Sequence, residues 1–323
     1  MEKYDLVVVG DANPDVVVRG APEVLTFGQA EREVSGATLT LGGSGALVAH
    51  AAARLGLRTA FVGLLGQDHA GDLVLRLLEE AGVDVSGVRR DPGLQTAITV
   101  VFAKPDGDRA ILTAPGSLSA FGPEHVDQAL LMRARHVHVA SAFLQPRLTA
   151  ALAGLLAIAR SAGAVTSLDT NDDPSGQWVL DREDLLGVVD YLLPNAWEAA
   201  ALAFGPSGAA DDPLPAARAL AAAGPCVVVK CGAQGALSVD RTQVLRARLA
   251  VQVPTLVDTV GAGDAFDAGF VAGLSQGLDL RGALRLAVAV GTLSTRRVGG
   301  MDGQPGAAEA ARLAEHVVVE DEE

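Results

Sequence analysis

The sequence predicts an α/β fold with a mostly parallel central sheet flanked by helices on both faces. Short β-branched runs alternate with amphipathic Ala- and Leu-rich segments from end to end, the pattern of parallel strands covered by helices. The chain has 323 residues, 49% of them hydrophobic and 20% charged, so it can bury a large core. No internal repeat or linker interrupts it, and we expect a single domain over residues 1–323.

Each expected element follows from its local pattern. Aliphatic and β-branched runs predict strands at 5–10, 59–65, 136–140, 164–169, 190–193 and 225–230. Apolar residues at helical spacing predict helices at 45–55, 71–81, 214–223, 264–276 and 281–295. The first two helices stop at Gly56 and Gly82, because glycine commonly ends helices. The final residues, VVVEDEE, are expected to form a solvated acidic tail.

Two regions, about 15–40 and 95–113, break this alternation. The second predicts a β-hairpin, because QTAITVVFA and RAILTA flank a turn at 104–108 that contains Asp-Gly. Together the two regions predict a small antiparallel sheet that projects from the main one. We interpret it as a lid over a site. The alternative is a flap through which the chain forms a homodimer, and the two roles are compatible.

Charge and cysteine content exclude several classes of protein. The 25 basic and 39 acidic residues give a net charge of −14, which repels nucleic-acid polymers and anionic membranes, so an anionic ligand must be held locally. Cys226 and Cys231 are the only cysteines, so the sequence predicts neither a disulfide framework nor a zinc site. His136 and His138 have no partners spaced to bind metal. The apolar run in the N-terminal segment MEKYDLVVVGD is too short for the core of a signal peptide, so we expect a cytoplasmic protein.

The segment 258–266, DTVGAGDAF, carries the strongest chemical signal. Phe266, Phe270 and Leu274 recur at helical spacing, so a helix begins near Asp264 with the Gly-Ala-Gly turn at its N-terminus. Such a turn lets backbone amides approach an anion without any Lys or Arg. Asp264 would then accept the proton of a hydroxyl that attacks phosphorus, whereas the alternative is an ordinary helix cap.

This segment resembles the C-terminal signature D-T-x-G-A-G-D-x-F of the ribokinase-like (PfkB) carbohydrate kinase family. Other family landmarks follow in the right order from Gly10 to about residue 300. The resemblance implies a ribokinase-like fold and an enzyme that uses ATP to phosphorylate a hydroxyl. It also implies that Asp264 is the catalytic base and that Gly261, Ala262 and Gly263 form the anion hole.

Two N-terminal segments resemble the acceptor-binding part of the family. VVVGDANPD is similar to the family's strand followed by N-x-D, which assigns Asn13 and Asp15 to the acceptor; the alternative for Asp15 is a turn residue. LGGSGALVAHAAARLG resembles the family's sugar-binding loop, where Gly42 and Gly43 let substrate approach the backbone. Leu47 stands where the family has an Asn, so it either favours a larger, less hydroxylated acceptor or turns into the core.

Two segments in the middle of the chain extend the resemblance. LDTN, residues 168–171, resembles the family's D-x-N and assigns Asp169 to the substrate site. Asp173 occupies the position where many sugar-acid and sugar-phosphate kinases carry Arg, and like-charge repulsion there predicts a neutral acceptor. NAWE resembles the family's N-x-x-E, which places Asn195 near the triphosphate and lets Glu198 act on Mg²⁺ through water. A helix capping box is the alternative.

The loop KCGAQG resembles the family's nucleotide loop, and assigns Lys230, Gly232 and Gly235 to cofactor binding together with Asn195 and Asp264. A plain turn between two strands is the alternative, since GALSVD follows directly. These glycines would admit the phosphates and the adenosine of ATP.

The segment 294–302, STRRVGGMD, lies where family members wrap a loop around adenine. The resemblance implies a monovalent cation such as K⁺, held by carbonyl groups of this loop alongside Asp258 and Val260. Arg296 and Arg297 are expected to be solvated or paired with the acidic tail rather than to bind a ligand.

The sequence therefore predicts an ATP- and Mg²⁺-dependent kinase that phosphorylates a hydroxyl of a small neutral sugar or sugar-like molecule. A nucleoside kinase of the same fold is the alternative, mildly favoured by Leu47. A dinucleotide-binding oxidoreductase would need G-x-G-x-x-G after the first strand, but the residues there are Gly10-Asp11-Ala12-Asn13. Retention of Asp264 argues against a non-catalytic relative.

Overall fold

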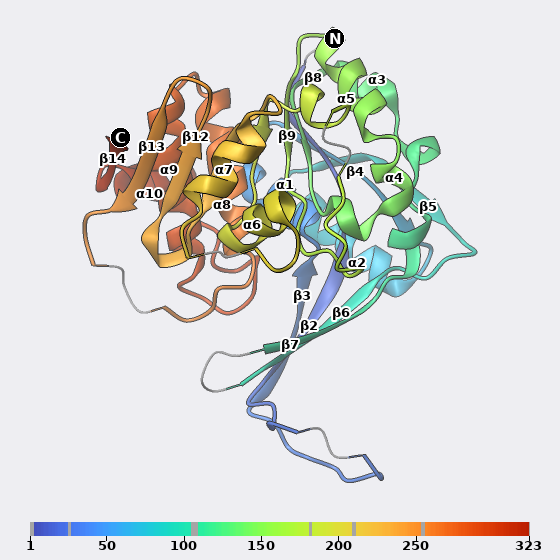
Figure 1. Cartoon of the computed structure of the whole chain (residues 1–323). Helices are drawn as coiled ribbons and strands as arrows, with labels where there is room; N and C mark the ends of the chain where they lie inside the picture. The colour runs from blue at the N-terminus through green and yellow to red at the C-terminus, as the bar shows by residue number, and fades with distance from the viewer. Residues whose placement is uncertain are drawn as a thin grey trace.

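The computed structural model describes residues 3–24, 27–104, 109–180, 183–208, 211–252 and 256–322. Figure 1 shows a large α/β body from which a narrow four-stranded sheet projects. None of the helices in these ranges is long and apolar enough to cross a membrane.

The body is built on one ten-stranded sheet. In spatial order its strands are β14 (Val317–Asp321), β13 (Val244–Leu249), β12 (Ala236–Val239), β11 (Cys226–Lys230), β10 (Tyr191–Leu192), β9 (Val165–Leu168), β8 (Ala134–Val139), β1 (Tyr4–Val9), β4 (Thr59–Gly66) and β5 (Asp84–Asp91). The seven strands from β11 to β5 pair in parallel, and β11 to β14 pair antiparallel. The predicted mostly parallel sheet is confirmed.

Helices cover both faces of this sheet, because successive residues of its strands point to opposite sides. Val7 and Val9 pack in a core with helices α3 (Gln128–Met132), α5 (Leu152–Ser161), α6 (Ala196–Phe204) and α7 (Leu214–Ala221). Leu6 and Val8 pack on the other side, whose helices are α1 (Ser44–Arg54), α2 (His69–Glu80), α8 (Ala262–Ser275), α9 (Leu280–Ser294) and α10 (Ala307–Ala314). Shorter helical turns are α4 (Pro146–Thr149), η1 (Gly116–Ala120), η2 (Pro123–His125), η3 (Ala142–Leu144), η4 (Leu186–Val188) and η5 (Gly232–Gln234).

The small sheet consists of β3 (Gly36–Gly42), β2 (Asn13–Arg19), β6 (Ile98–Ala103) and β7 (Arg109–Ala114), in that order. The predicted hairpin of β6 and β7 is confirmed, although its turn at 105–108 lies outside the described residues. The outer pairs are antiparallel, but the central strands β2 and β6 run parallel, because the chain passes through β4 and β5 of the body between them.

The two faces of the small sheet differ in chemistry. Four polar residues lie side by side across one face, in the order Thr40, Asp15, Thr99 and Thr113. The next row on the opposite face is Leu39, Val16, Val100 and Leu112, of which the first and last are about 60% exposed. One face thus offers hydrogen bonds beside the body, and the other leaves apolar surface uncovered.

The sequence prediction lacked several elements of the body, namely α3, α5, α6, α10 and β13, and two further parts also differ from it. The prediction of a solvated C-terminal tail is wrong, because these residues form β14. This strand pairs with β13 and is also held by ion pairs such as that of Arg246 with Glu322 at 2.7 Å. The strand β5 was not expected, because its sequence DVSGVRRD has few aliphatic residues. It follows α2 directly and gains its pairing at the edge of the sheet beside β4.

Candidate active site

Polar side chains gather where five neighbouring parallel strands of the large sheet end. Asp11 follows β1, Ser141 follows β8, Asp169 follows β9 and Asn195 follows β10, while Lys230 is the last residue of β11. Because the carboxyl ends of parallel strands meet at one edge of the sheet, residues far apart in the chain become neighbours there. This edge is the candidate active site.

Helix α8 begins at this edge with the predicted Gly-Ala-Gly turn. Gly261 precedes the helix with φ of 70°, a left-handed conformation that favours glycine. The amide of Ala262 already donates to the Thr259 carbonyl at 3.2 Å. The amides of Gly263 and Asp264 have no partner among the described residues, as expected in the first turn of a helix. The Gly261 amide likewise has no partner among the described residues, so of the predicted set only the Ala262 amide is already engaged.

The Asp264 side chain lies in this first turn and is almost fully buried. Burial and the negative charge of Asp169 raise the pKa of its carboxyl to about 7, while Lys230 and hydrogen bonding from the Ser44 hydroxyl oppose that rise. A carboxyl whose pKa lies near neutrality can both accept and release a proton at cellular pH. Asp264 thus has the environment that the predicted base requires.

The predicted acceptor residues lie together at the base of the small sheet. Asn13 Nδ2 donates to Asp15 Oδ1 at 2.8 Å and to Thr99 Oγ1 at 3.2 Å, and burial raises the pKa of Asp15 to about 7. A Cβ at Gly42 would lie 1.9 Å from Asp15 Oδ1, so only glycine leaves room for that carboxylate. Gly43 has φ of 83° and a Cβ there would lie 2.7 Å from the backbone after β1.

Four further residues at the site were not assigned a role from the sequence. The Asp11 carboxylate accepts hydrogen bonds from the amides of Ser44 at 3.1 Å and Gly45 at 2.9 Å, and so holds the start of α1. Asn171 Nδ2 donates to Ser44 Oγ at 3.0 Å and to Ser141 Oγ at 3.1 Å. Asp11 and Asn171 stand inside segments that resemble the family, whereas nothing in the sequence marks Ser141.

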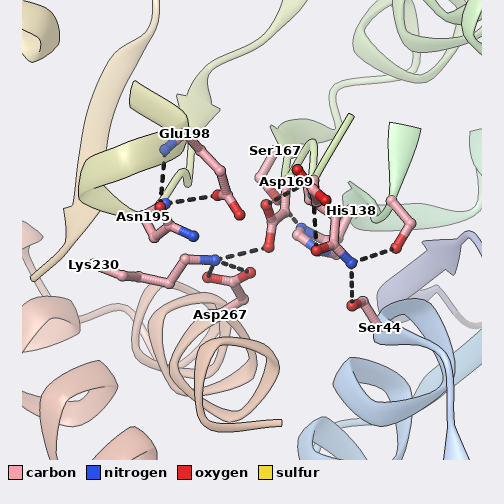
Figure 2. A network of polar contacts seen from close by, with 11 residues as sticks. Ser44, His138, Ser167, Asp169, Asn195, Glu198, Lys230 and Asp267 are labelled. Carbon is pink, nitrogen blue, oxygen red and sulfur yellow. Dashed lines mark hydrogen bonds and ion pairs between the residues drawn. The ribbon is translucent and has the colours of Figure 1, made fainter. Parts of the chain in front are cut away.

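A buried ion cluster connects β9, β11 and α8 (Figure 2). Lys230 Nζ lies 2.7 Å from Asp169 Oδ2 and 3.2 Å from Asp267 Oδ2. Burial opposes ionisation of Asp169, but its ion pair with Lys230 outweighs that effect and lowers its pKa. The sequence assigned Lys230 and Asp169 to a site, but it gave no role to Asp267, whose side chain is fully buried.

Asn195 and Glu198 cap the start of α6. Glu198 Oε2 accepts from the Asn195 amide at 2.8 Å, and Asn195 Oδ1 accepts from the Glu198 amide at 2.9 Å (Figure 2). The capping box left open in the sequence is therefore present. Burial and the charge of Asp169 raise the pKa of Glu198 to about 7, which leaves a carboxyl able to ionise beside a cation.

A hollow of about 440 Å³ opens beside this helix start. Its lining is Asn195, Ala196, Trp197, Asp211, Pro213, Lys230, Cys231, Gly232 and Gln234. Most of the predicted nucleotide-binding residues therefore border one space. Asp264 and Gly235 do not line it. Gly235 has φ of 92°, and a Cβ there would lie 2.0 Å from the Ala247 carbonyl oxygen of β13. Its glycine is explained by the turn between β11 and β12, which was the alternative considered.

Asp258, one of the residues predicted to bind a monovalent cation, connects the loop before α8 with the 294–302 segment through hydrogen bonds. Asp258 Oδ1 accepts from the Val260 amide at 3.0 Å, and Asp258 Oδ2 accepts from the Gly299 amide at 2.9 Å. This brings the 294–302 segment against the loop before α8, as a shared cation site requires. Arg296 pairs with Glu309 of α10 rather than with the C-terminal residues.

Asp173 stabilises a local turn. Its two carboxylate oxygens accept from the Ser175 amide and hydroxyl, both at 2.8 Å, and from the Trp178 amide at 2.7 Å. These hydrogen bonds lower the pKa of Asp173 despite its burial, so its negative charge is retained, and its effect on a phosphorylated acceptor stays a prediction.

Leu47 turns into the core, the second of the two possibilities. It is buried, and its Cδ1 lies 2.8 Å from where a Cβ at Gly300 would be. Gly300 in turn packs against Gly261, because a Cβ at Gly261 would lie 2.6 Å from Gly300 Cα. Leu47 thus supports the start of α8 from behind.

The two central histidines both contact one serine of the neighbouring strand. His136 Nε2 and His138 Nδ1 lie 2.7 Å and 2.8 Å from Ser167 Oγ, and burial lowers the pKa of these imidazoles to about 3 and about 4. Among the described residues, no group of three or more His, Cys, Asp or Glu side chains is arranged to hold a metal by itself.

The sheet is covered by helices on both faces, and its strand ends surround a buried carboxylate at a helix N-terminus. Polar side chains suited to bind hydroxyls lie beside that carboxylate. This combination of fold and site is that of the small-molecule kinases. Comparison with known proteins gives the family. Residues 3–306 match the family model described as pfkB family carbohydrate kinase. The chain belongs to this family and is an ATP-dependent carbohydrate kinase.

The relatives act on several kinds of sugar. The chain is 34% identical over 313 residues to an ATP-dependent ribose-1-phosphate kinase of Halopiger xanaduensis, covering 95% of this chain and 97% of that protein. It is 30% identical over 288 residues to a 2-dehydro-3-deoxygluconokinase of Bacillus subtilis, covering 84% and 86%. A structure of Arabidopsis thaliana ribokinase complexed with ribose and ATP matches with a TM-score of 0.85 at 26% identity, covering 98% of this chain and 99% of that chain.

Replacing Asp264 tests the base. We expect Asp264→Asn to lower kcat by about 10²- to 10⁴-fold, because the amide cannot accept the acceptor's proton. In the unmodified enzyme kcat/KM should rise with pH through about 7, since burial raises the pKa of Asp264 to that value and only the ionised form is a base. Steady-state kinetics between pH 5 and 9 measure both effects. Near-normal turnover in the variant would remove Asp264 from the reaction.

Adding one methyl group at Gly42 tests the acceptor pocket. Gly42→Ala should raise KM for the acceptor by more than about ten-fold and leave KM for ATP nearly unchanged, because the new Cβ must displace Asp15. Gly154→Ala is the matched control, since nothing lies within 4 Å of a Cβ at this position in α5. Equal kinetics in the two variants would contradict the placement of Asp15 in the acceptor site.

Proposed function

We propose that this enzyme transfers the γ-phosphoryl group of ATP to a hydroxyl of a small sugar at the edge where β1, β8, β9, β10 and β11 end. The observation that carries the proposal is the buried Asp264 in the first turn of α8, beside two open backbone amides and near Lys230. Both the base and the positive field that phosphoryl transfer requires are thereby in one place.

Each part of the site has its own role in the proposed reaction. Asp15 and Asn13 hold the acceptor's hydroxyls, and Asp264 takes the proton of the attacking hydroxyl as the new O–P bond forms. The amides of Gly263 and Asp264 bind the transferred group, while the electron pair of the breaking P–O bond leaves with ADP. The hollow beside Asn195, Lys230 and Gly232 receives the nucleotide.

Two cations complete the proposal. Glu198 and Asn195 fit Mg²⁺ through retained water, because Asn195 borders the hollow, the capping box uses only Oε2 of Glu198, and that carboxyl is able to ionise. When bound, Mg²⁺ would neutralise phosphate charge. Asp258 and the Val260 carbonyl supply hard oxygens at the junction of two loops, which fits a monovalent cation such as K⁺. Asp169 orients the site through Lys230.

The acceptor is a sugar bearing vicinal hydroxyls, since the side chains around it are carboxylates, amides and hydroxyls rather than aromatic rings. A phosphorylated sugar is the competing acceptor, supported by the similarity to a ribose-1-phosphate kinase, whereas the retained charge of Asp173 favours the neutral sugar predicted from the sequence. The nucleoside alternative has one supporting observation: an adenosine kinase of Sinorhizobium meliloti matches with a TM-score of 0.79 at 25% identity, covering 97% of this chain and 99% of that chain.

An acceptor panel tests the proposal. ADP formation from ATP and Mg²⁺ is measured with ribose, ribose 1-phosphate, fructose, 2-dehydro-3-deoxygluconate and adenosine. We expect kcat/KM for at least one sugar or sugar phosphate to exceed that for adenosine by more than ten-fold. The Asp264→Asn variant controls for a contaminating kinase. Turnover with adenosine alone would replace the sugar by the nucleoside, and no turnover with any acceptor would contradict the proposal.

The exposed apolar face of the small sheet supports a homodimer, in which two copies cover Leu39 and Leu112 of one another. Leu112→Asp should convert a dimer to a monomer in sedimentation equilibrium. Val179→Asp is the control, because Val179 is 73% exposed but lies in the body. A wild-type monomer, or an unchanged dimer in the first variant, would contradict this interface. The cytoplasmic location and the exclusion of nucleic-acid and membrane partners stay predictions from the sequence.

A further inference from the structure

The ammonium group of Lys230 lies beside the start of a helix. Its Nζ lies 3.5 Å from the point that a Cβ at Gly263 would occupy, so it borders the first turn of α8. The N-terminal end of a helix carries partial positive charge, which repels a cation, and burial of the lysine adds a desolvation cost. The neighbouring carboxylates outweigh both effects and raise the pKa of Lys230, so the group stays charged beside the open amides of α8.

Two carboxylates hold the ammonium in this position. Asp169 approaches it to 2.7 Å from the end of β9, and both oxygens of Asp267 approach it to 3.2 Å and 3.4 Å from α8 (Figure 2). Asp267 lies one helical turn after Gly263, so the two residues share a face of α8. The lysine backbone is fixed as well, because its amide donates to the Pro194 carbonyl at 2.9 Å.

The three donors of this ammonium group are unequally engaged. The contact with Asp169 is short, at 2.7 Å, whereas the two contacts with Asp267 are long, at 3.2 Å and 3.4 Å, and both go to one carboxylate. A phosphoryl oxygen beside the first turn of α8 would compete for a donor that makes one of these long contacts.

We propose that Lys230 donates a hydrogen bond to the phosphoryl group in transfer, and that Asp267 is the positioning residue that holds the lysine for it. This inference rests on the proposed function. The O–P bond to the acceptor forms as the bond to the ADP oxygen breaks, the acceptor's proton goes to Asp264, and Lys230 keeps its own protons throughout. The anion hole predicted from the sequence consists of backbone amides and contains no Lys or Arg. Lys230 adds a formal positive charge to it.

A purely structural ion cluster is the competing explanation. In that case loss of Lys230 would weaken the fold, and every ligand would bind less well to the same degree. A contact with the transferred group instead predicts a loss confined to ligands that carry a γ-phosphate. Comparing ADP with β,γ-imido-ATP separates the two, because these ligands differ in that group.

The experiment measures the dissociation constants of both nucleotides with Mg²⁺ by calorimetry for the wild type, Lys230→Met and Lys3→Met. We expect Lys230→Met to weaken β,γ-imido-ATP at least about ten-fold more than ADP, the size of a lost charged hydrogen bond. Lys3→Met, which removes an exposed lysine, should match the wild type. Equal weakening of the two nucleotides by Lys230→Met would overturn the contact.

A double variant guards against misfolding, since Lys230→Met leaves Asp267 without its cation. Lys230→Met with Asp267→Asn should recover melting temperature relative to Lys230→Met alone, yet keep the loss of preference for β,γ-imido-ATP and a kcat reduced by about 10²-fold or more. Recovery of that preference together with stability would assign the lysine a structural role only.

The role of Asp267 is tested by a graded pair of variants. Asp267→Ala removes both oxygens that face Lys230, whereas Asp267→Asn keeps one oxygen as an acceptor. We expect the alanine variant to lose most of the preference for β,γ-imido-ATP and the asparagine variant to retain more of it. An alanine variant with the wild-type preference would overturn the positioning role. These binding measurements need no sugar, so intact γ-phosphate preference without turnover on any acceptor would count against the proposed function alone.

Discussion

The excess of buried carboxyl groups over cations is the constraint on which this site depends. Asp11, Asp15, Asp169, Asp264 and Asp267 are all buried at one edge of the sheet with Glu198 nearby, and Lys230 is the only basic side chain paired with them in the described part of the chain. A low-dielectric site cannot keep that many negative charges. Protons therefore stay bound near neutral pH, or cations replace them. Such a site suits a kinase, because ATP binds together with Mg²⁺. The incoming cation would offset the negative charge that the carboxylates carry in the free protein.

The fold is arranged so that backbone groups, rather than additional cations, offset part of this charge. Asp11 is held by two amides at the start of α1, and the open amides of α8 face the opposite side of the site. Close approach of these segments demands glycine at Gly43, where φ is 83°, and at Gly261, where φ is 70°. Leu47 packs behind that second turn through Gly300. Apolar packing thus determines where the charged groups meet.

The sequence predicted those parts of the molecule that local pattern controls. Periodicity gave the strands and helices near Asp264 and Gly43, and the family resemblance named residues that the fold brings to one edge. Contacts between distant segments left no local signal: Lys230 meets Asp267 only because β11 ends beside α8. The same limit applies to Asp173, which was interpreted from its position in a motif, although its carboxylate accepts hydrogen bonds from Ser175 and Trp178 of its own turn. The acidic tail was interpreted from composition, but β13 offered it a partner.

The site also sets how folding stability depends on pH. Burial raises the pKa of Asp15, Glu198 and Asp264 to about 7 from the lower values of exposed carboxyls, so the folded chain binds these protons more tightly than the unfolded chain does. Their contribution to the free energy of unfolding is fully present below the pKa of the unfolded carboxyls, near 4. It is lost as pH rises through about 7. The ionised site that catalysis requires is therefore the less stable form of the fold, and bound cations are what would stabilise it at neutral pH.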